Sequence, residues 1–255
     1  MEELRFLGLS THSAFENMAI DEAVMLAIKD GSSPPTFRLY RWKPDAVSIG
    51  TFQSMRDEVD LVFCQENGID YIRRITGGGA VFHDYEGEIT YSLILPRKHR
   101  LVPDDIIDSY EIVCSGIVRA LRMLGIDSQF RPINDIVVGE RKVSGNAQTR
   151  RHGCMLQHGT VLLDLDVVKM FQVLKVPAEK VSDKMIADVK QRVTSIRDIV
   201  GRKVPFEELK SALVDGFSES LGMTLSSGNL SASEEKRAKI LAQEKYSTGE
   251  WNLAR

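Results

Sequence analysis

Hydrophobic residues near the start of the chain follow a helical spacing. Phe15, Met18 and Ile28 belong to an apolar set that recurs at intervals of about three to four residues, which places its members on one face of a helix. Ser13 followed by Glu16 matches a capping box. Because a glycine and then two prolines follow this set, the pattern predicts a helix over residues 14–30.

Short runs rich in β-branched and aromatic residues come next and predict strands. These runs cover residues 36–42, 46–50, 69–75, 79–83, 88–95, 135–138, 141–147 and 154–163. One long amphipathic pattern interrupts them, starting at Pro103 and ending at Gly125. This inserted segment predicts a single long helix among the strands.

Beyond residue 164 the apolar spacing becomes helical again. It predicts helices at about 166–175, 205–221 and 232–245. Because the order is one helix, many strands and then helices, we expect an α+β fold of mixed or antiparallel sheets packed with helices, with a helical C-terminal part. We expect one domain over residues 1–255, with a core at about 32–225 and a C-terminal helical segment at about 226–255.

Composition narrows the function classes. The 255 residues include 33 Lys and Arg against 36 Asp and Glu, a net charge of −3 that lacks the basic footprint of a nucleic-acid binder. Three cysteines at wide spacings form no CxxC pair, so we expect neither a disulfide framework nor a structural metal site. Without a signal peptide or an apolar run long enough to span a bilayer, we expect a cytoplasmic protein without membrane contact.

The segment RRITGGGAVFHD, residues 73–84, is the first candidate site. Three glycines between two predicted strands indicate close backbone approach or unusual dihedral angles. Arg73 and Arg74 before them and His83 after them surround the backbone amides with donors suited to a carboxylate or phosphate. The alternative is a mobile hairpin turn. The spacing fits neither a Walker loop nor a dinucleotide fingerprint.

The segment NDIVVGERKVSGNAQTRRHG, residues 134–153, is the second candidate site. A turn at Gly139 would place Asn134 and Asp135 on the strand beside Lys142. A lysine suits a site where one cation binds a carboxylate and a phosphate oxygen. A solvated lysine beside a hairpin turn is the alternative.

The segment CMLQHGTVLLDLD, residues 154–166, is the third candidate site. His158 in this predicted strand is either a site residue or a hydrogen-bonded structural residue. Cys154 follows Arg150, Arg151 and His152, which would lower the pKa of its thiol and favour a nucleophile. The alternative is a small buried apolar residue.

Together these segments resemble the lipoate-protein ligase A family of the wider biotin and lipoate ligase superfamily. The resemblance rests on NMAIDEA at 17–23, SIGTFQ at 48–53, RRITGGGAVFHD at 73–84, ND at 134–135, RKVSGNAQ at 141–148, QHGTVLL at 157–163 and KYSTGEWN at 245–252. It implies a catalytic domain similar to class II synthetases. It also implies Lys142 as the catalytic residue that contacts the lipoyl carbonyl and the α-phosphate.

The resemblance further implies a set of binding residues. Those for the adenylate and the lipoyl chain are Arg73, Arg74, Thr76, Gly77, Gly78, Gly79, Val81, Phe82 and His83. Those on the phosphate side and in the rest of the pocket are Asn134, Asp135, Ser144, Gly145, Asn146, Ala147, His158 and Gly159. Asp135 is the expected Mg²⁺ ligand.

The family reaction activates lipoate with ATP and passes the lipoyl group to a lysine of an acceptor protein. An octanoyl- or lipoyl-transferase that uses a cysteine thioester without ATP is the first alternative, and a biotin-protein ligase is the second. Because residues 130–143 contain no cysteine where the transferases carry their nucleophile, we expect an ATP-dependent lipoate-protein ligase with ATP, lipoate and Mg²⁺.

The implied partners are lipoyl domains of 2-oxo acid dehydrogenase complexes and the glycine cleavage H protein. Longer family members carry a C-terminal accessory domain that we do not expect here, so the resemblance also implies a possible separate small accessory subunit. Arg150, Arg151 and residues 97–100 are a candidate docking surface for an acidic acceptor domain.

Overall fold

A computed structural model describes residues 2–175 and 183–254. Its main element is an eight-stranded mixed sheet with the order β11-β1-β2-β6-β10-β9-β8-β7. Strand β1 runs parallel to both of its neighbours, and the other pairs are antiparallel. The strands are β1 (Glu2–His12), β2 (Thr36–Trp42), β6 (Glu88–Pro96), β7 (Gln129–Arg131), β8 (Asp135–Val138), β9 (Arg141–Arg151), β10 (Cys154–Leu162) and β11 (Met223–Ser227).

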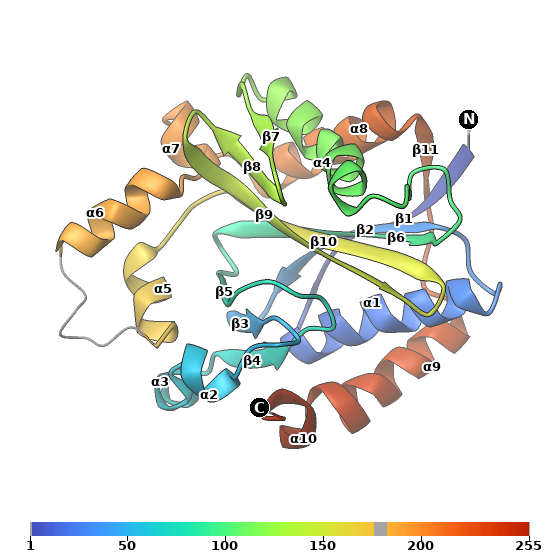
Figure 1. Ribbon diagram of the computed structural model, residues 1–255, viewed down its shortest axis with the longest axis horizontal. Coiled ribbons are helices and arrows are strands. Elements are labelled where there is room, and N and C mark those ends of the chain that lie inside the picture. The colour runs from blue at the N-terminus through green and yellow to red at the C-terminus, as the bar shows by residue number, and fades with distance from the viewer. Residues whose placement is uncertain (1, 176–182, 255) are drawn as a thin grey trace.

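A second sheet of three strands has the order β4-β3-β5. It consists of β3 (Ala46–Ile49), β4 (Asp70–Arg73) and β5 (Val81–His83). Two short helices, α2 (Met55–Glu58) and α3 (Leu61–Glu66), connect β3 to β4. The small sheet carries the glycine-rich segment at its β4–β5 connection and lies below the left end of the main sheet in Figure 1.

Helices cover both faces of the main sheet (Figure 1). On one face, α4 (Ile106–Met123) and α8 (Phe206–Leu221) pack on each other and on the sheet, with Ile117 and Phe217 in one apolar core. On the other face, α1 (Ala14–Lys29) and α9 (Ala232–Leu241) share a second core that includes Met25 and Tyr246. The remaining helical elements are α5 (Val167–Val173), α6 (Asp183–Arg192), α7 (Ile196–Val200), the π-helical turn η2 (Ala242–Tyr246) and α10 (Gly249–Asn252).

Most expected elements are present with small shifts at their ends. The Ser13 hydroxyl accepts from the Glu16 amide, and the Glu16 carboxylate accepts from the Ser13 amide, which confirms the predicted capping box. The α+β class and the helical C-terminal part are confirmed. In the described ranges, none of the helices is long and apolar enough to cross a membrane.

Three strands were missed by the pattern: the three-residue β7, β1 and β11. Strand β1 changes register between Phe6 and Leu9, where Gly8 has a φ of +73°, so its apolar residues do not alternate. Strand β11 lies in a region expected to be helical and pairs with β1. Because a parallel partner far away in the chain stabilises each of them, local periodicity carries little signal for either strand.

Candidate functional site

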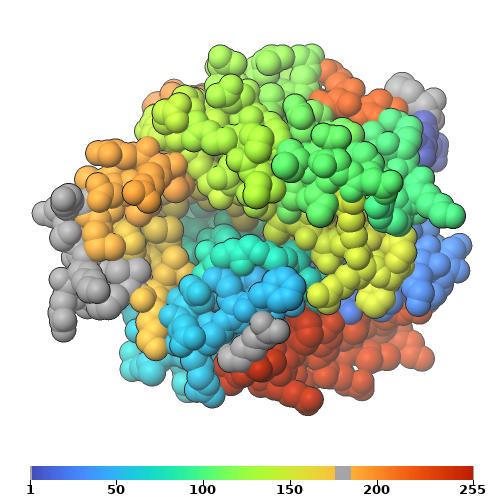
Figure 2. All heavy atoms as spheres, in the orientation of Figure 1, coloured from blue at the N-terminus to red at the C-terminus, as the bar shows by residue number. Residues whose placement is uncertain are grey.

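A cavity of about 300 Å³ lies where the two sheets meet. In Figure 2 the surface is hollowed between the yellow-green segments of β8 and β9 and the cyan and teal segments of the small sheet. Its walls come mainly from β2, β3, β5, β9 and β10 and from the glycine-rich segment. The candidate segments predicted from the sequence therefore converge on one cavity.

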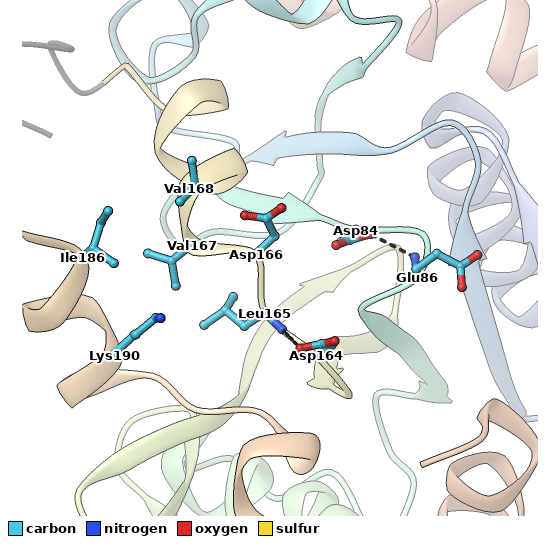
Figure 3. Close-up of a pocket in the computed structure, with 9 residues that line it drawn as sticks. All are labelled: Asp84, Glu86, Asp164, Leu165, Asp166, Val167, Val168, Ile186 and Lys190. Carbon is cyan, nitrogen blue, oxygen red and sulfur yellow. Dashed lines mark hydrogen bonds between the residues drawn. The ribbon is translucent and has the colours of Figure 1, made fainter. Parts of the chain in front are cut away.

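A second cavity of about 360 Å³ adjoins the first and shares Leu165 with it. Figure 3 shows its acidic wall, with Asp84, Asp164 and Asp166 opposite Lys190. It contains none of the residues expected at the site. We therefore assign the candidate site to the first cavity.

Lys142 lies at the polar end of the cavity on β9. The tight turn at Gly139, with a φ of +58°, brings β9 back beside β8 and places Lys142 Nζ 2.6 Å from Asp135 Oδ1. Gly145 leaves room for this lysine, because a Cβ there would lie 2.6 Å from Lys142 Nζ. The Lys142 side chain remains 38% exposed, so its ammonium group can reach a ligand.

Asn146 is held in one orientation by Tyr91 and Asn134. Tyr91 donates to its Oδ1 at 2.7 Å, and its Nδ2 donates to the Asn134 carbonyl at 2.9 Å. Asn134 donates in return to the Asn146 carbonyl. A Cβ at Gly159 would come 2.1 Å from Asn146 Oδ1, so this position requires glycine. The arrangement fixes the amide groups in the cavity wall.

Arg74 is a buried cation in the cavity wall. Its Nη1 donates to the Ser48 carbonyl at 3.1 Å, and its Nη2 donates to the carbonyls of Gly77 and Gly79 at 2.8 and 2.7 Å. Burial lowers its pKa to about 10. Among the described residues no carboxylate forms an ion pair with it, so its charge favours an anion or a polarised carbonyl in the cavity.

The glycine-rich segment packs closely against Gly50, the residue that follows β3. A Cβ at Gly50 would lie 2.1 Å from the Gly78 carbonyl oxygen, which explains the glycine of the SIGTFQ segment. A Cβ added at Gly77 or at Gly79 would meet no other atom within 4 Å. The segment is therefore fixed on one side and leaves backbone next to open space on the other.

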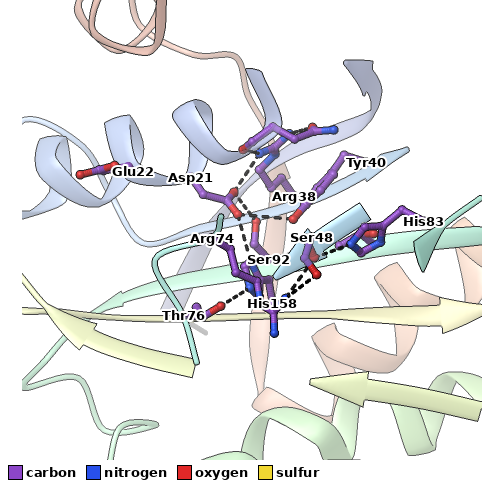
Figure 4. A network of polar contacts seen from close by, with 12 residues as sticks. Asp21, Glu22, Arg38, Tyr40, Ser48, Arg74, Thr76, His83, Ser92 and His158 are labelled. Carbon is purple, nitrogen blue, oxygen red and sulfur yellow. Dashed lines mark hydrogen bonds and ion pairs between the residues drawn. The ribbon is translucent and has the colours of Figure 1, made fainter. Parts of the chain in front are cut away.

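His83 lies in a chain of hydrogen bonds, shown in part in Figure 4. Its Nε2 is 2.8 Å from Ser48 Oγ and its Nδ1 is 2.7 Å from Glu88 Oε1. The Trp42 ring stacks on the imidazole with centroids 4.0 Å apart. Because β3, β5 and β6 each contribute one of the three linked residues, only the folded sheets bring them together.

His158 belongs to a separate buried network (Figure 4). Its Nε2 is 2.8 Å from Thr76 Oγ1, and its Nδ1 is 3.5 Å from Asp21 Oδ2. Burial lowers the pKa of His158, so the ring is neutral near neutral pH. Asp21 also forms an ion pair with Arg38 at 2.8 Å and accepts a hydrogen bond from the Ser92 hydroxyl. Burial alone raises the pKa of Asp21, but these charged and polar neighbours lower it overall.

The structure brings most of the expected residues to the cavity. Those that line it are Arg74, Gly78, Gly79, Val81, Phe82, His83, Asn134, Lys142, Gly145, Asn146, Ala147, His158 and Gly159. Those outside its wall are Arg73, Thr76, Gly77, Asp135 and Ser144. The binding and catalytic roles of all of them stay predictions.

Arg73 lies on the other side of β4 from the cavity. Its guanidinium donates to the carbonyls of Gln53, Trp251 and Asn252 at 2.6, 3.1 and 3.2 Å. The Asn252 side chain accepts from the Arg73 amide at 2.8 Å. Arg73 thus ties the C-terminal helix α10 to the small sheet.

Sequence reasoning missed the apolar part of the cavity. Its members include Trp42, Leu162, Leu165, Met170, Leu174 and Val193. They come from strands, from α5 and from connections next to β10, α5 and α6, and they look like ordinary core positions in the sequence. Ser48 and Glu88 were missed as well, although SIGTFQ contains Ser48.

All three cysteines of the chain are buried and lie outside the cavity wall. Burial raises the pKa of Cys64 to about 12 and also raises the pKa of Cys114 and Cys154. Cys154 packs against α1 and donates to the Met25 carbonyl at 3.5 Å. Its environment is that of a buried apolar residue, not of an activated thiolate.

No metal site stands out in the part of the chain that the structure describes. It contains no group of three or more His, Cys, Asp or Glu side chains arranged to hold an ion. The Asp135 carboxylate faces Lys142 instead. Mg²⁺ binding at Asp135 stays a prediction.

A cavity that is lined by apolar side chains, a lysine and a buried arginine fits a ligand with an apolar body and an anionic or polarised carbonyl group. Residues 13–218 match the family model described as the lipoyl protein ligase A/B catalytic domain. The chain therefore belongs to this family, which confirms the resemblance seen in the sequence.

Curated relatives match the chain over its full length. The octanoyltransferase LipM of Kyrpidia tusciae is 39% identical over 274 residues and covers 99% of both chains. The octanoyltransferase LipM of Bacillus subtilis is 33% identical and covers 100% of this chain and 99% of its own length. The expectation of an ATP-dependent, amide-forming lipoate-protein ligase is therefore wrong, because these full-length relatives are octanoyltransferases.

Solved structures confirm the fold. A bi-partite lipoate protein ligase from Thermoplasma acidophilum superposes with a TM-score of 0.87 at 36% identity, covering 99% of this chain and 96% of that chain. A lipoate-protein ligase A bound with ATP superposes with a TM-score of 0.83 at 32% identity, covering 99% of both chains. The fold of this family is thus shared by ligases and octanoyltransferases.

Proposed function

We propose that this protein transfers an octanoyl group from a thioester donor to the side-chain amine of a lysine in a lipoyl domain, without ATP. The observation that carries this proposal is the identity of 33–39% with octanoyltransferases along the whole chain. Three features of the cavity support the proposed octanoyl transfer.

The first support is the match between the cavity and an acyl chain. Apolar side chains such as Leu162, Met170 and Leu174 line the cavity. An octanoyl chain buried there leaves water, and this apolar transfer contributes binding free energy of about 0.8 kcal/mol for each buried methylene group. The polar end then holds the acyl carbonyl.

The second support is the presence of two cations in the cavity wall. Lys142 is partly exposed on β9, and Arg74 is buried in the opposite strand connection. When an amine attacks a thioester, negative charge develops on the carbonyl oxygen. Fixed cations and amide donors in a site with little water stabilise that charge strongly.

The third support is the fixed amide of Asn146. Its Nδ2 is held by the Asn134 carbonyl, and its Oδ1 accepts from Tyr91. Since the Nδ2 and Oδ1 atoms of Asn146 are both oriented before a substrate enters, this part of the cavity wall needs little reorganisation during the reaction.

The transferase alternative expected from the sequence included a cysteine thioester. The three buried cysteines with raised pKa values do not suit that role. The alignment with the K. tusciae relative spans 274 positions, more than the 255 residues of this chain, so that relative carries segments that this chain lacks. The proposed transfer therefore does not pass through a cysteine of this chain.

The test is a comparison of acyl donors. The full chain is incubated with a lipoyl domain and either an octanoyl carrier-protein thioester or free octanoate with ATP and Mg²⁺, and acylated acceptor is measured by mass spectrometry. We expect transfer from the thioester without nucleotide. Acylation only in the presence of ATP would contradict the proposal.

We extend the proposal to the partners. The acceptors are lipoyl domains of 2-oxo acid dehydrogenase complexes and the glycine cleavage H protein, and a separate small accessory subunit supports the reaction. The support for this subunit is that the T. acidophilum neighbour is a bi-partite enzyme. If the subunit is needed, adding it raises the rate with either acceptor; an unchanged rate removes it from the proposal.

A further inference from the structure

Three buried side chains form a linear relay at the cavity wall. Ser48 Oγ lies 2.8 Å from His83 Nε2, and His83 Nδ1 lies 2.7 Å from Glu88 Oε1. Ser48 and His83 line the cavity, whereas Glu88 lies behind them and is only 1% exposed. The order hydroxyl, imidazole, carboxylate is the one in which an imidazole takes a proton from a nucleophilic serine.

The surroundings of the relay fix its proton positions. Trp42 Nε1 donates to Thr90 Oγ1 at 2.7 Å, and Thr90 donates to Glu88 Oε1 at 3.0 Å. In the His83 tautomer with its proton on Nδ1, the ring donates to this same Glu88 oxygen. His83 Nε2 is then the acceptor for the Ser48 hydroxyl.

Arg74 completes the arrangement from the other side of Ser48. Its Nη1 lies 3.1 Å from Ser48 Oγ and donates to it. The Ser48 oxygen therefore has an acceptor for its proton on one side and a cation on the other. A cation at this distance stabilises negative charge on the serine oxygen and on a neighbouring carbonyl oxygen.

We propose that Ser48 is the nucleophile that carries the octanoyl group between donor and acceptor, an inference that rests on the proposed function. Ser48 Oγ attacks the thioester carbonyl and the Ser48 proton passes to His83 Nε2. The C–S bond then breaks, the proton passes from His83 to the departing sulfur as a thiol is released, and an octanoyl ester remains on Ser48.

The second half of the reaction regenerates the serine. The neutral amine of the acceptor lysine attacks the ester carbonyl and forms the C–N bond, while His83 Nε2 takes a proton from the attacking nitrogen. The bond between the carbonyl carbon and Ser48 Oγ breaks, and His83 returns that proton to Ser48. The products are the octanoyl amide and the free enzyme, and no oxidant, metal or nucleotide is consumed.

The experiment is acyl-enzyme trapping by mass spectrometry. The wild-type chain is incubated with an octanoyl carrier-protein thioester and no acceptor, then digested and mapped. We expect one octanoyl group on the peptide that contains Ser48 and its loss when a lipoyl domain is added. Ser48→Ala should lose the adduct and lower the transfer rate about 100-fold or more.

Two further variants serve as controls. Ser128→Ala removes another buried serine hydroxyl, one without a hydrogen-bond partner among the described residues, and should keep adduct and rate. Ser48→Cys, which keeps a nucleophile in place if Ser48→Ala fails to fold, should give a thioester that hydroxylamine cleaves at neutral pH. Glu88→Gln tests positioning and should lower the rate of adduct formation more than it changes donor affinity.

The outcomes separate the two proposals. If the wild-type chain transfers no octanoyl group from the thioester to any acceptor, the proposed function is wrong and the role of Ser48 fails with it. If the wild type transfers the group while Ser48→Ala is equally active, or while the Ser48→Cys variant forms no thioester, only the role of Ser48 is overturned.

Discussion

Lys142 Nζ and Asp135 Oδ1 lie 2.6 Å apart on neighbouring antiparallel strands. The carboxylate holds the ammonium group at the polar end of the cavity, and both side chains remain about one-third exposed. Water screens this pair, so we expect it to contribute little to the stability of the fold. In the proposed transfer, its role is to position Lys142, the cation expected to stabilise the acyl carbonyl.

Replacement of that cation should reduce catalysis. Lys142→Met keeps most of the apolar stem but removes the charge, and we expect kcat/KM for octanoyl transfer to fall by about 100-fold or more. Lys210→Met, at a half-buried lysine paired with Glu207 on α8 and outside the cavity wall, is the matched control and should retain wild-type activity. Equal activity in the Lys142 variant would remove this lysine from the mechanism.

Gly145→Ala separates activity from stability. A methyl group there would lie 2.6 Å from Cε and Nζ of Lys142 and must displace the end of that flexible side chain. We expect a loss of activity of about 10-fold or more with a change in unfolding free energy below about 1 kcal/mol. Gly249→Ala is the control, because its Cβ would meet Leu253 at an ordinary 3.8 Å.

Stability should depend on the protonation of His158. Burial lowers its pKa in the folded state, although Asp21 acts in the opposite direction and Arg74 and His83 add to the lowering. As pH falls below 6.5, the unfolded chain takes up a proton that the folded chain does not. The free energy of unfolding should therefore decrease by up to about 1.4 kcal/mol per pH unit for this group.

Urea unfolding between about pH 7 and about pH 5 measures this dependence. The variant His158→Gln should show a smaller decrease than the wild type. The half-buried His12 also has a lowered pKa, so His12→Gln should reduce the slope in the same direction. Asp21, whose pKa is lowered from 3.8, loses its stabilising effect only below this window. An unchanged slope in His158→Gln would mean that the ring is already charged or exposed.

Arg73 should matter for folding more than for substrate binding. It is buried and donates to carbonyls of α10 and of the connection after β3. Arg73→Met leaves these acceptors without their donor, so we expect the free energy of unfolding to fall by about 2–3 kcal/mol. Thermal unfolding and proteolysis near Trp251 test this; a normal stability combined with a raised KM would place Arg73 in the substrate site.

Local signals were sufficient for elements that carry their own ends and turns. The Ser13 cap, the amphipathic α4 and the turn at Gly139 are encoded within a few neighbouring residues. The same turn places Lys142 and Asp135 on neighbouring strands, as the sequence predicts. Strands β1 and β11 lack such signals, because a register shift or a distant parallel partner sets their pattern.

The candidate site also has a part that the sequence predicts and a part that it does not. Its glycines and Lys142 belong to short motifs, and these motifs resemble those of the family. The relay of Ser48, His83 and Glu88 joins strands of two sheets, and nothing in the separate segments indicates that they meet. Arg73 and Arg74 are adjacent in the chain yet point to opposite sides, one toward α10 and one toward the cavity.

The amino-acid sequence thus carries the family, the α+β class and the glycine and lysine motifs, since each depends on short-range patterns. The three-dimensional packing sets which polar groups share hydrogen bonds, which cysteines are buried and which arginine is left with a charge facing the cavity. The physical reason is that burial and hydrogen bonding act between residues far apart in the chain, where periodicity carries no information.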